Sequence, residues 1–120
     1  MSRTYLEDKL QIALVYELRL RLPPDVQFFH TPNGGERAKR EAAKLKAMGV
    51  LPGIPDLMFL LPDGTWRGIE LKVGRNTLTP EQHAFKARWG DRVAVCRSAV
   101  EVEAALRLWG FVLKGRAVAA

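Results

Sequence analysis

Apolar residues recur at helical spacing at the start of the chain and then change to a strand-like run. A helix is predicted over Tyr5–Leu22, and Pro23-Pro24 ends it. One face of this helix carries Leu6, Leu10, Ala13, Leu14 and Leu18. A short strand is predicted at Val26–His30, followed by the turn-rich segment Thr31–Gly35.

The next helical pattern lies in a segment dense in basic residues. It predicts a helix over Glu36–Met48 that stops at Gly49, a residue suited to the left-handed conformation after a helix. Its apolar positions are Ala38, Ala42, Leu45 and Met48. Another face carries Arg37, Arg40 and Lys44, a cationic ridge that can hold DNA phosphates without reading bases. A solvated helix face explains the same ridge equally well.

The second half of the chain predicts a hairpin, then a helix, a strand and a last helix. The hairpin strands are Leu57–Leu61 and Trp66–Val73. Thr79-Pro80 opens the third helix as N-cap and first residue, and a strand follows at Arg92–Arg97. A capping box at Ser98–Glu101 opens the last helix, which runs to about Trp109. The order α-β-α-β-β-α-β-α predicts an α/β or α+β fold with one small mixed sheet and helices packed against it.

Size and composition limit the classes of protein that remain. The 120 residues suit one domain, here 1–114, with 115–120 as a loose tail. A 48% hydrophobic and 27% charged composition argues against a disordered chain, and the longest apolar stretch, Leu57–Pro62, is too short to cross a bilayer. Cys96 is the single cysteine and no signal peptide is visible, so a cytoplasmic location is expected.

The net charge gives the first functional hint. Nineteen Lys and Arg against thirteen Asp and Glu leave +6 at pH 7 and a pI near 9.9. Basic domains of this size often bind polyanions, because Lys and Arg displace counterions from phosphates. A basic surface that only maintains solubility is the alternative.

Alternation within Trp66–Val73 gathers the candidate chemistry on one face of a strand. Ile69, Leu71 and Val73 point to one side, and Glu70 and Lys72 point together to the other. Taken alone, such a pair is usually solvated.

Asp56 changes this interpretation because it begins the partner strand. A two-residue turn centred on Asp63-Gly64 would pair Leu57 with Glu70, and a bulge near Gly68 would then place Asp56 directly opposite Glu70. Adjacent carboxylates repel each other unless a cation lies between them. Hard oxygen ligands favour Mg²⁺ or Mn²⁺ over Zn²⁺.

An Asp followed by Glu-x-Lys on a hairpin resembles the PD-(D/E)xK nuclease superfamily. Five segments in this order resemble, more narrowly, its viral replication and repair nuclease (VRR-NUC) family. They are Glu7 with Gln11, His30–Gly35, Gly49–Asp56, Ile69–Lys72 and Thr79–Gln82. The resemblance runs from about residue 5 to residue 100 and implies a restriction-endonuclease-like core.

The resemblance also implies roles for individual residues. Asp56 and Glu70 would ligate the divalent metal, helped by the backbone carbonyl of Leu71. Lys72 would orient or activate the attacking water. Glu7 would approach from the first helix, directly or through a metal-bound water, and Gln82 would support the site from the third helix. Catalysis by a metal agrees with this set, since it lowers the pKa of bound water and neutralises charge on the phosphate.

Several of these positions have a purely structural alternative. Thr4–Glu7 and Thr79–Gln82 are both capping boxes, so Glu7 and Gln82 can serve their own helices. The superfamily often carries a Tyr where this chain has Lys86, which weakens the case for Gln82. His30 and Asn33 are candidates for DNA contact, yet Pro-Asn-Gly is also an ordinary turn.

Among the residues left over, His83 is expected at the surface, and the three tryptophans, Trp66, Trp89 and Trp109, are expected to pack in the core.

The leading hypothesis is therefore a Mg²⁺- or Mn²⁺-dependent DNA nuclease. By resemblance, it would act on branched or structured DNA, including four-way (Holliday) junctions, in replication, recombination or repair. Symmetry of such junctions suggests a homodimer. The alternative is a non-catalytic nucleic-acid-binding module that retains the fold. A restriction-type enzyme would need base-reading segments, and the loops offer none.

Overall fold

Four helices and four strands make up most of residues 5–32 and 40–115, which this computed structural model describes. The elements are α1 (Tyr5–Arg21), β1 (Gln27–His30), α3 (Ala42–Ala47), β2 (Leu57–Leu60), β3 (Trp66–Leu71), α4 (Pro80–Trp89), the 3₁₀ turn η1 (Gly90–Arg92), β4 (Val93–Cys96) and α5 (Ala99–Leu108). The expected mixed α+β fold is confirmed. Among the described helices, none has the length and apolar character needed to cross a membrane.

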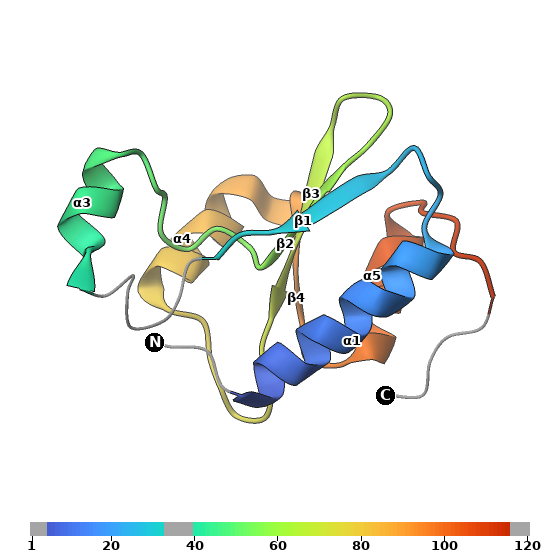
Figure 1. The fold of residues 1–120 in the computed structure, drawn as a ribbon, viewed down its shortest axis with the longest axis horizontal. Helices are drawn as coiled ribbons and strands as arrows, with labels where there is room; N and C mark the ends of the chain where they lie inside the picture. The colour runs from blue at the N-terminus through green and yellow to red at the C-terminus, as the bar shows by residue number, and fades with distance from the viewer. Residues whose placement is uncertain (1–4, 33–39, 116–120) are drawn as a thin grey trace.

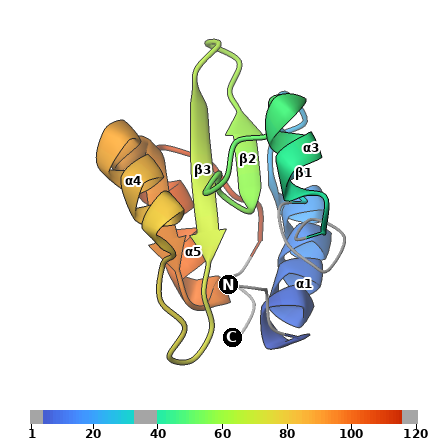
Figure 2. The ribbon, with the colours of Figure 1, turned by 90° about the vertical axis from the view of Figure 1, so that its left-hand side faces the viewer.

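The sheet is mixed, with strand order β1-β2-β3-β4. β2 pairs antiparallel with both β1 and β3, whereas β3 and β4 are parallel. A parallel pair needs a crossover connection, which α4 supplies. α1 and α5 lie together on one side of the sheet and α4 lies on the other, as Figure 1 shows. In Figure 2, α4 and α1 are seen on either side of β2 and β3.

The main core lies between the sheet and the α1–α5 layer. Leu57, Phe59, Ile69 and Leu71 of the central strands are fully buried, at 0% exposure. They pack with residues of α1, β4 and α5 and of the segments that follow α1 and α5, namely Leu14, Leu18, Leu22, Cys96, Val102, Leu106, Phe111 and Leu113. This set follows from strand alternation, because every second residue of β2 and β3 faces this layer.

The opposite face of the sheet carries a smaller aromatic cluster under α4. The ring centroid of Trp66, on β3, lies 5.6 Å from that of Trp89 and 6.1 Å from that of Phe85, and both of these residues are on α4. Trp109 instead packs beside the main core, and its Nε1 donates to the Asp91 carbonyl at 2.8 Å. Packing of the tryptophans is confirmed for Trp66 and Trp109, although Trp89 stays 38% exposed.

The predicted packing face of α1 was wrong in part. Leu14 and Leu18 are buried, but Leu6 is 59% exposed and Ala13 is exposed as well. The buried face continues instead through Glu7 and Arg21. The helix has apolar residues on both sides, so the pattern alone did not indicate which side packs.

The apolar stripe predicted for the second helix was also wrong. Ala42 is exposed, Met48 is 70% exposed, and α3 has no buried residue. Ala38 lies outside the described residues. The predicted stop at Gly49 is confirmed: its φ is 99°, and the Val50 amide donates to the Leu45 carbonyl at 2.9 Å, as in a Schellman motif.

The hairpin turn differs from the prediction by one residue. Leu57 pairs with Ile69, not with Glu70. The connection is the three-residue loop Pro62–Gly64, in which Gly64 has a φ of 87° and its amide donates to the Leu61 carbonyl at 3.0 Å. A three-residue loop with a glycine at the left-handed position shifts the register relative to a two-residue turn. Continued by one step, the observed register places Asp56 opposite Glu70 without any bulge.

Two of the three predicted helix caps lie within the described residues, and one of these differs in detail. Thr79 and Gln82 form the complete capping box of α4. Ser98 caps α5 through the Glu101 amide, but the Glu101 carboxylate accepts from the Arg97 amide at 2.7 Å. The reciprocal half of the predicted box at Ser98 was therefore wrong, because the carboxylate reaches one residue further back.

Candidate active site

Asp56 lies immediately before β2 and is held on both its side chain and its backbone. It is 8% exposed. Its Oδ2 accepts from the Leu71 amide at 2.7 Å, across the β2–β3 pair. Its carbonyl accepts from the Thr31 amide at 3.1 Å and from Nδ1 of His30 at 2.8 Å. The carboxylate is thus oriented by β3 and the backbone by the end of β1.

Two glycines pack closely against neighbouring segments and so fix the path of the chain that leads to Asp56. A Cβ on Gly68 would come within 2.7 Å of the Pro55 ring, so the glycine lets this proline lie against β3. Thr31 adds a hydrogen bond of 2.5 Å from its hydroxyl to the Pro55 carbonyl. A Cβ on Gly53 would come within 2.5 Å of the Glu81 carbonyl oxygen, so this loop touches the first turn of α4.

Glu70 and Lys72 are both 4% exposed and lie on the face of the sheet that α4 covers. The Lys72 Nζ is 3.9 Å from the Glu70 Oε2, which makes them a buried ion pair. Gln82 of α4 donates from Nε2 to the same carboxylate oxygen at 3.0 Å. The Lys72 ammonium and the Gln82 amide therefore both stabilise the Glu70 carboxylate, whose negative charge would be energetically costly to bury alone.

The Gln82 amide serves two purposes at once. Its Oε1 accepts from the Thr79 amide at 2.9 Å, which completes the capping box, while its Nε2 holds Glu70. The two alternatives weighed from the sequence, cap and site support, are therefore not exclusive. Capping fixes the side-chain orientation and so directs the other half of the amide at the site.

Glu7 reaches the sheet from the first turn of α1 and is 2% exposed. Its Oε2 accepts from the Val73 amide at 3.2 Å and from the Asn76 side-chain amide at 2.9 Å. The carboxylate thus joins α1 to the segment that follows β3. Thr4, its proposed capping partner, lies outside the described residues.

The predicted residues do not all meet at one point. Within residues 5–32 and 40–115, no three His, Cys, Asp or Glu side chains are grouped closely enough to hold a metal ion. The strand register brings Asp56 opposite Glu70, whose carboxylate lies 3.9 Å from the Lys72 ammonium. Glu7 instead accepts hydrogen bonds from Val73 and Asn76, in the segment that follows β3. Leu71 contacts Asp56 through its amide; the ligand role of its carbonyl stays a prediction.

The predicted DNA-contacting residues are dispersed. His30 is exposed and uses Nδ1 to hold the Asp56 carbonyl; since a carbonyl only accepts, Nδ1 carries the proton. Arg40 and Lys44 are exposed at and near α3, which stands at one end of the molecule in Figure 1. Asn33 and Arg37 fall outside the described residues.

Sequence reasoning missed Asn76, which looks like an ordinary loop residue along the chain. Thr31, Gly53 and Gly68 were named from the sequence, but the contacts that they make here were not foreseen. Gly53 has a positive φ of 85°, and its place between Pro52 and Pro55 was the sequence signal for this turn. Lys86, which stands where the superfamily often has Tyr, binds the carbonyls of Gly90 and Val93 at 3.0 and 2.7 Å and supports η1.

Cys96 lies behind the site as the strand partner of Leu71. Burial, and to a smaller extent the negative charge of Glu101, raises the pKa of its thiol to about 12. The thiol is therefore neutral near pH 7 and does not act as a nucleophile there. His83, as expected, is exposed.

Comparison of the chain with models of known protein families, with curated proteins and with solved structures found no match.

Proposed function

We propose that this protein is a metal-dependent DNA nuclease of the VRR-NUC family, with the restriction-endonuclease-like core of the PD-(D/E)xK superfamily. One observation carries the proposal: Asp56, Glu70 and Lys72 are all buried, and the sheet brings them to one face. Two opposed carboxylates and an ammonium are an expensive set to bury for stability alone. They are the groups that phosphodiester hydrolysis with a divalent metal requires.

The donor set fits Mg²⁺ or Mn²⁺. Mg²⁺ keeps several waters and is usually bound through one or two carboxylates together with substrate phosphate oxygens. Asp56 and Glu70 would hold it, with Glu7 entering through a bridging water, since Glu7 is bonded to the end of β3. Bound there, the metal would activate water and neutralise phosphate charge. Zn²⁺ prefers His and Cys ligands, and in the described residues His30 uses its Nδ1 on the Asp56 carbonyl while Cys96 is buried on β4, so the set suits Zn²⁺ less well.

The protein side chains contribute positioning and charge. Lys72, held 3.9 Å from Glu70, places its ammonium where a phosphate oxygen would approach, and stabilises charge that develops there. The Leu71 amide and Gln82 keep the two carboxylates from rotating away. Burial strengthens each of these interactions, because water screens them less.

The substrate proposed is branched or structured DNA, including four-way junctions, met in replication, recombination or repair. The net charge of +6 supports a polyanionic partner. Cys96, the single cysteine and a free thiol, agrees with the reducing cytoplasmic setting that the proposal includes.

The test is a cleavage assay with labelled flaps, four-way junctions and plain duplex, with Mg²⁺, with Mn²⁺ and with chelator. We expect cleavage only with a metal, and Lys72→Ala should reduce the rate by about 100- to 1,000-fold, as loss of a charge-stabilising group does. Arg75→Ala, at an exposed cation outside the site, is the control for loss of charge. Failure to cut any of these DNAs with either metal would refute the proposal.

A further inference from the structure

β1 is an outer strand of the sheet, and its free edge is open to solvent. Within the described residues β1 pairs with β2 alone, since the strand order is β1-β2-β3-β4. Gln27, Phe29 and His30 are exposed, and β1 contains neither the lysine nor the proline that often protects an outer strand from further pairing. Such an edge can accept another strand.

The hydrogen bonds to β2 determine which backbone groups of β1 point outward. The Thr31 amide donates to the Asp56 carbonyl, one step beyond the last pair of the β1–β2 ladder. Hydrogen-bonded pairs recur at every second residue of an antiparallel ladder. The backbone N–H and C=O groups of Phe28 and His30 therefore point away from β2, toward the open edge.

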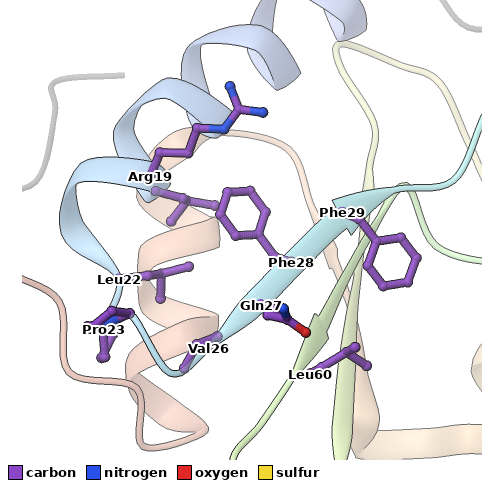
Figure 3. Close-up of a pocket in the computed structure, with 10 residues that line it drawn as sticks. Arg19, Leu22, Pro23, Val26, Gln27, Phe28, Phe29 and Leu60 are labelled. Atoms are coloured by element: carbon purple, nitrogen blue, oxygen red, sulfur yellow. The ribbon is translucent and has the colours of Figure 1, made fainter.

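An apolar groove lies beside this edge, between β1 and the C-terminal end of α1. Its volume is about 470 Å³, and Leu22 and Val26 line it together with residues of β1 and β2. Figure 3 shows Phe28 directed toward α1, whereas Phe29 and Leu60 lie on the opposite side of β1. We call this the edge groove. It offers apolar surface on both sides of the strand whose backbone is open.

The charge of the edge groove indicates the kind of molecule that fits it. Arg19 is the one charged residue among the described residues that line it, and it is exposed. A nucleic-acid strand requires several cations along its phosphates, which this groove lacks. A guanidinium can instead bind a single carboxylate through two parallel hydrogen bonds. An open strand edge, apolar surface and one cation together favour a polypeptide that carries apolar side chains and a carboxylate.

We propose that the edge groove binds an extended segment of a partner protein by strand addition to β1. Backbone hydrogen bonds to Phe28 and His30 set the register, alternate apolar side chains of the segment enter the groove, and an Asp or Glu of the segment pairs with Arg19. β1 has four residues, so few backbone hydrogen bonds form and apolar burial supplies most of the affinity. The inference does not rest on the proposed nuclease function, because this binding is measured without DNA or metal.

A display library of random peptides of about twelve residues, selected on the whole chain, supplies the probe. The enriched peptides should alternate apolar and polar residues and contain Asp or Glu. N-methylation of the selected peptide, one amide at a time, should weaken binding at least about tenfold at alternate amides of the bound stretch, because only these face β1. A selection that enriches no peptide, or methylation effects without alternation, would overturn the proposal.

A charge exchange tests the role of Arg19. Arg19→Glu should weaken peptide binding at least about tenfold, and a peptide with lysine in place of its acidic residue should bind this variant better than the wild type. Arg88→Glu, at an exposed arginine on α4, is the matched control and should bind like the wild type. Equal binding by the two variants would exclude Arg19 and overturn the proposal.

A second variant tests the apolar surface. Phe29→Ala should weaken peptide binding and leave the far-ultraviolet circular dichroism spectrum unchanged, since Phe29 is 48% exposed. Leu108→Ala, at an 87% exposed leucine on α5, is its control. Displacement of the bound peptide by single-stranded DNA would assign the groove to a nucleic acid. Loss of self-association in Phe29→Ala would assign it to a second copy of the chain, and either result would overturn the proposal.

Discussion

At the scale of single residues, the charged groups of the site are held by named partners. Asp56 is bonded to the Leu71 amide, Glu70 to Gln82 and Lys72, and Glu7 to Val73 and Asn76. A buried charge costs several kcal/mol unless neighbours compensate for it, so about this much would be lost by removing a partner. These contacts define which substitutions are informative.

Gln82→Ala should lower the cleavage rate by about 10- to 100-fold, as loss of a group that orients a metal ligand typically does. The reason is that Glu70 loses the donor at 3.0 Å that fixes its carboxylate. Thr79→Ala is the matched control: it removes the other half of the cap, costing about 1 kcal/mol, but leaves the Glu70 contact. Equal activity losses in both variants, at equal loss of stability, would contradict a positioning role.

Glu103 provides a prediction about pH. The hydrogen bond from Arg21 lowers the pKa of Glu103 below its ordinary 4.5, with a smaller contribution from Arg107. Because the folded-state pKa is depressed, the pair stabilises the fold above about pH 4.5 and this contribution disappears as pH falls through the folded pKa. The wild type should therefore exceed Glu103→Gln in unfolding free energy at pH 7, by less than about 1 kcal/mol. Urea unfolding at pH 3 should show a smaller difference in unfolding free energy between the two proteins. If the difference at pH 3 equals that at pH 7, the Arg21–Glu103 pair is not its source.

Strand alternation was enough to predict that Glu70 and Lys72 share a face, because the side-chain period in a strand does not depend on context. The Gln82–Glu70 contact was not accessible in the same way. It depends on where α4 packs, and the Thr79–Gln82 pattern has a complete local explanation as a cap. His30 shows the same limit, since its bond to the Asp56 carbonyl depends on strand pairing.

At the scale of elements, helix ends were predicted more reliably than packing faces. Gly49 and Thr79 ended and began helices as expected, because capping is a local preference. The faces of α1 and α3 were predicted less well, because both helices expose apolar residues. The register of the β2–β3 hairpin depended on whether its loop has two residues or three, which Asp63-Gly64 alone does not determine.

The contact between the Gly53 loop and α4 gives a prediction at this scale. Gly53→Ala should destabilise the protein by at least about 1 kcal/mol more than Gly64→Ala, the size of an overpacking penalty. The two glycines have nearly equal φ values, 85° and 87°, so the backbone cost is matched. The surroundings differ: a Cβ at Gly53 would lie 2.5 Å from the Glu81 backbone, whereas a Cβ at Gly64 would have no neighbouring atom within 4 Å.

Urea denaturation of both variants measures this difference. Gly53→Ala should also slow cleavage, because it pushes the Asp56 loop away from the helix that carries Gln82. If the two variants are equally stable and equally active, the loop does not depend on its contact with α4.

At the scale of the whole molecule, the mixed sheet separates two tasks. Its α1–α5 side contains the main core, whereas its α4 side contains Glu70, Lys72 and the aromatic cluster. The sequence predicted the layered α+β architecture, since hydrophobic periodicity identifies each element. It did not predict that Glu7 would bind the end of β3, because that depends on how α1 crosses the sheet.

The measurement that tests the central claim most directly compares cleavage and binding of one four-way junction by the wild type and by Asp56→Asn, in Mn²⁺. The substitution keeps the size of the side chain and can still accept the Leu71 amide, so the fold should persist. We predict that both proteins bind the junction and that only the wild type cuts it. A wild type that binds the junction with the same affinity as the variant and cuts nothing would show that the chain is a binding module, and would contradict this account.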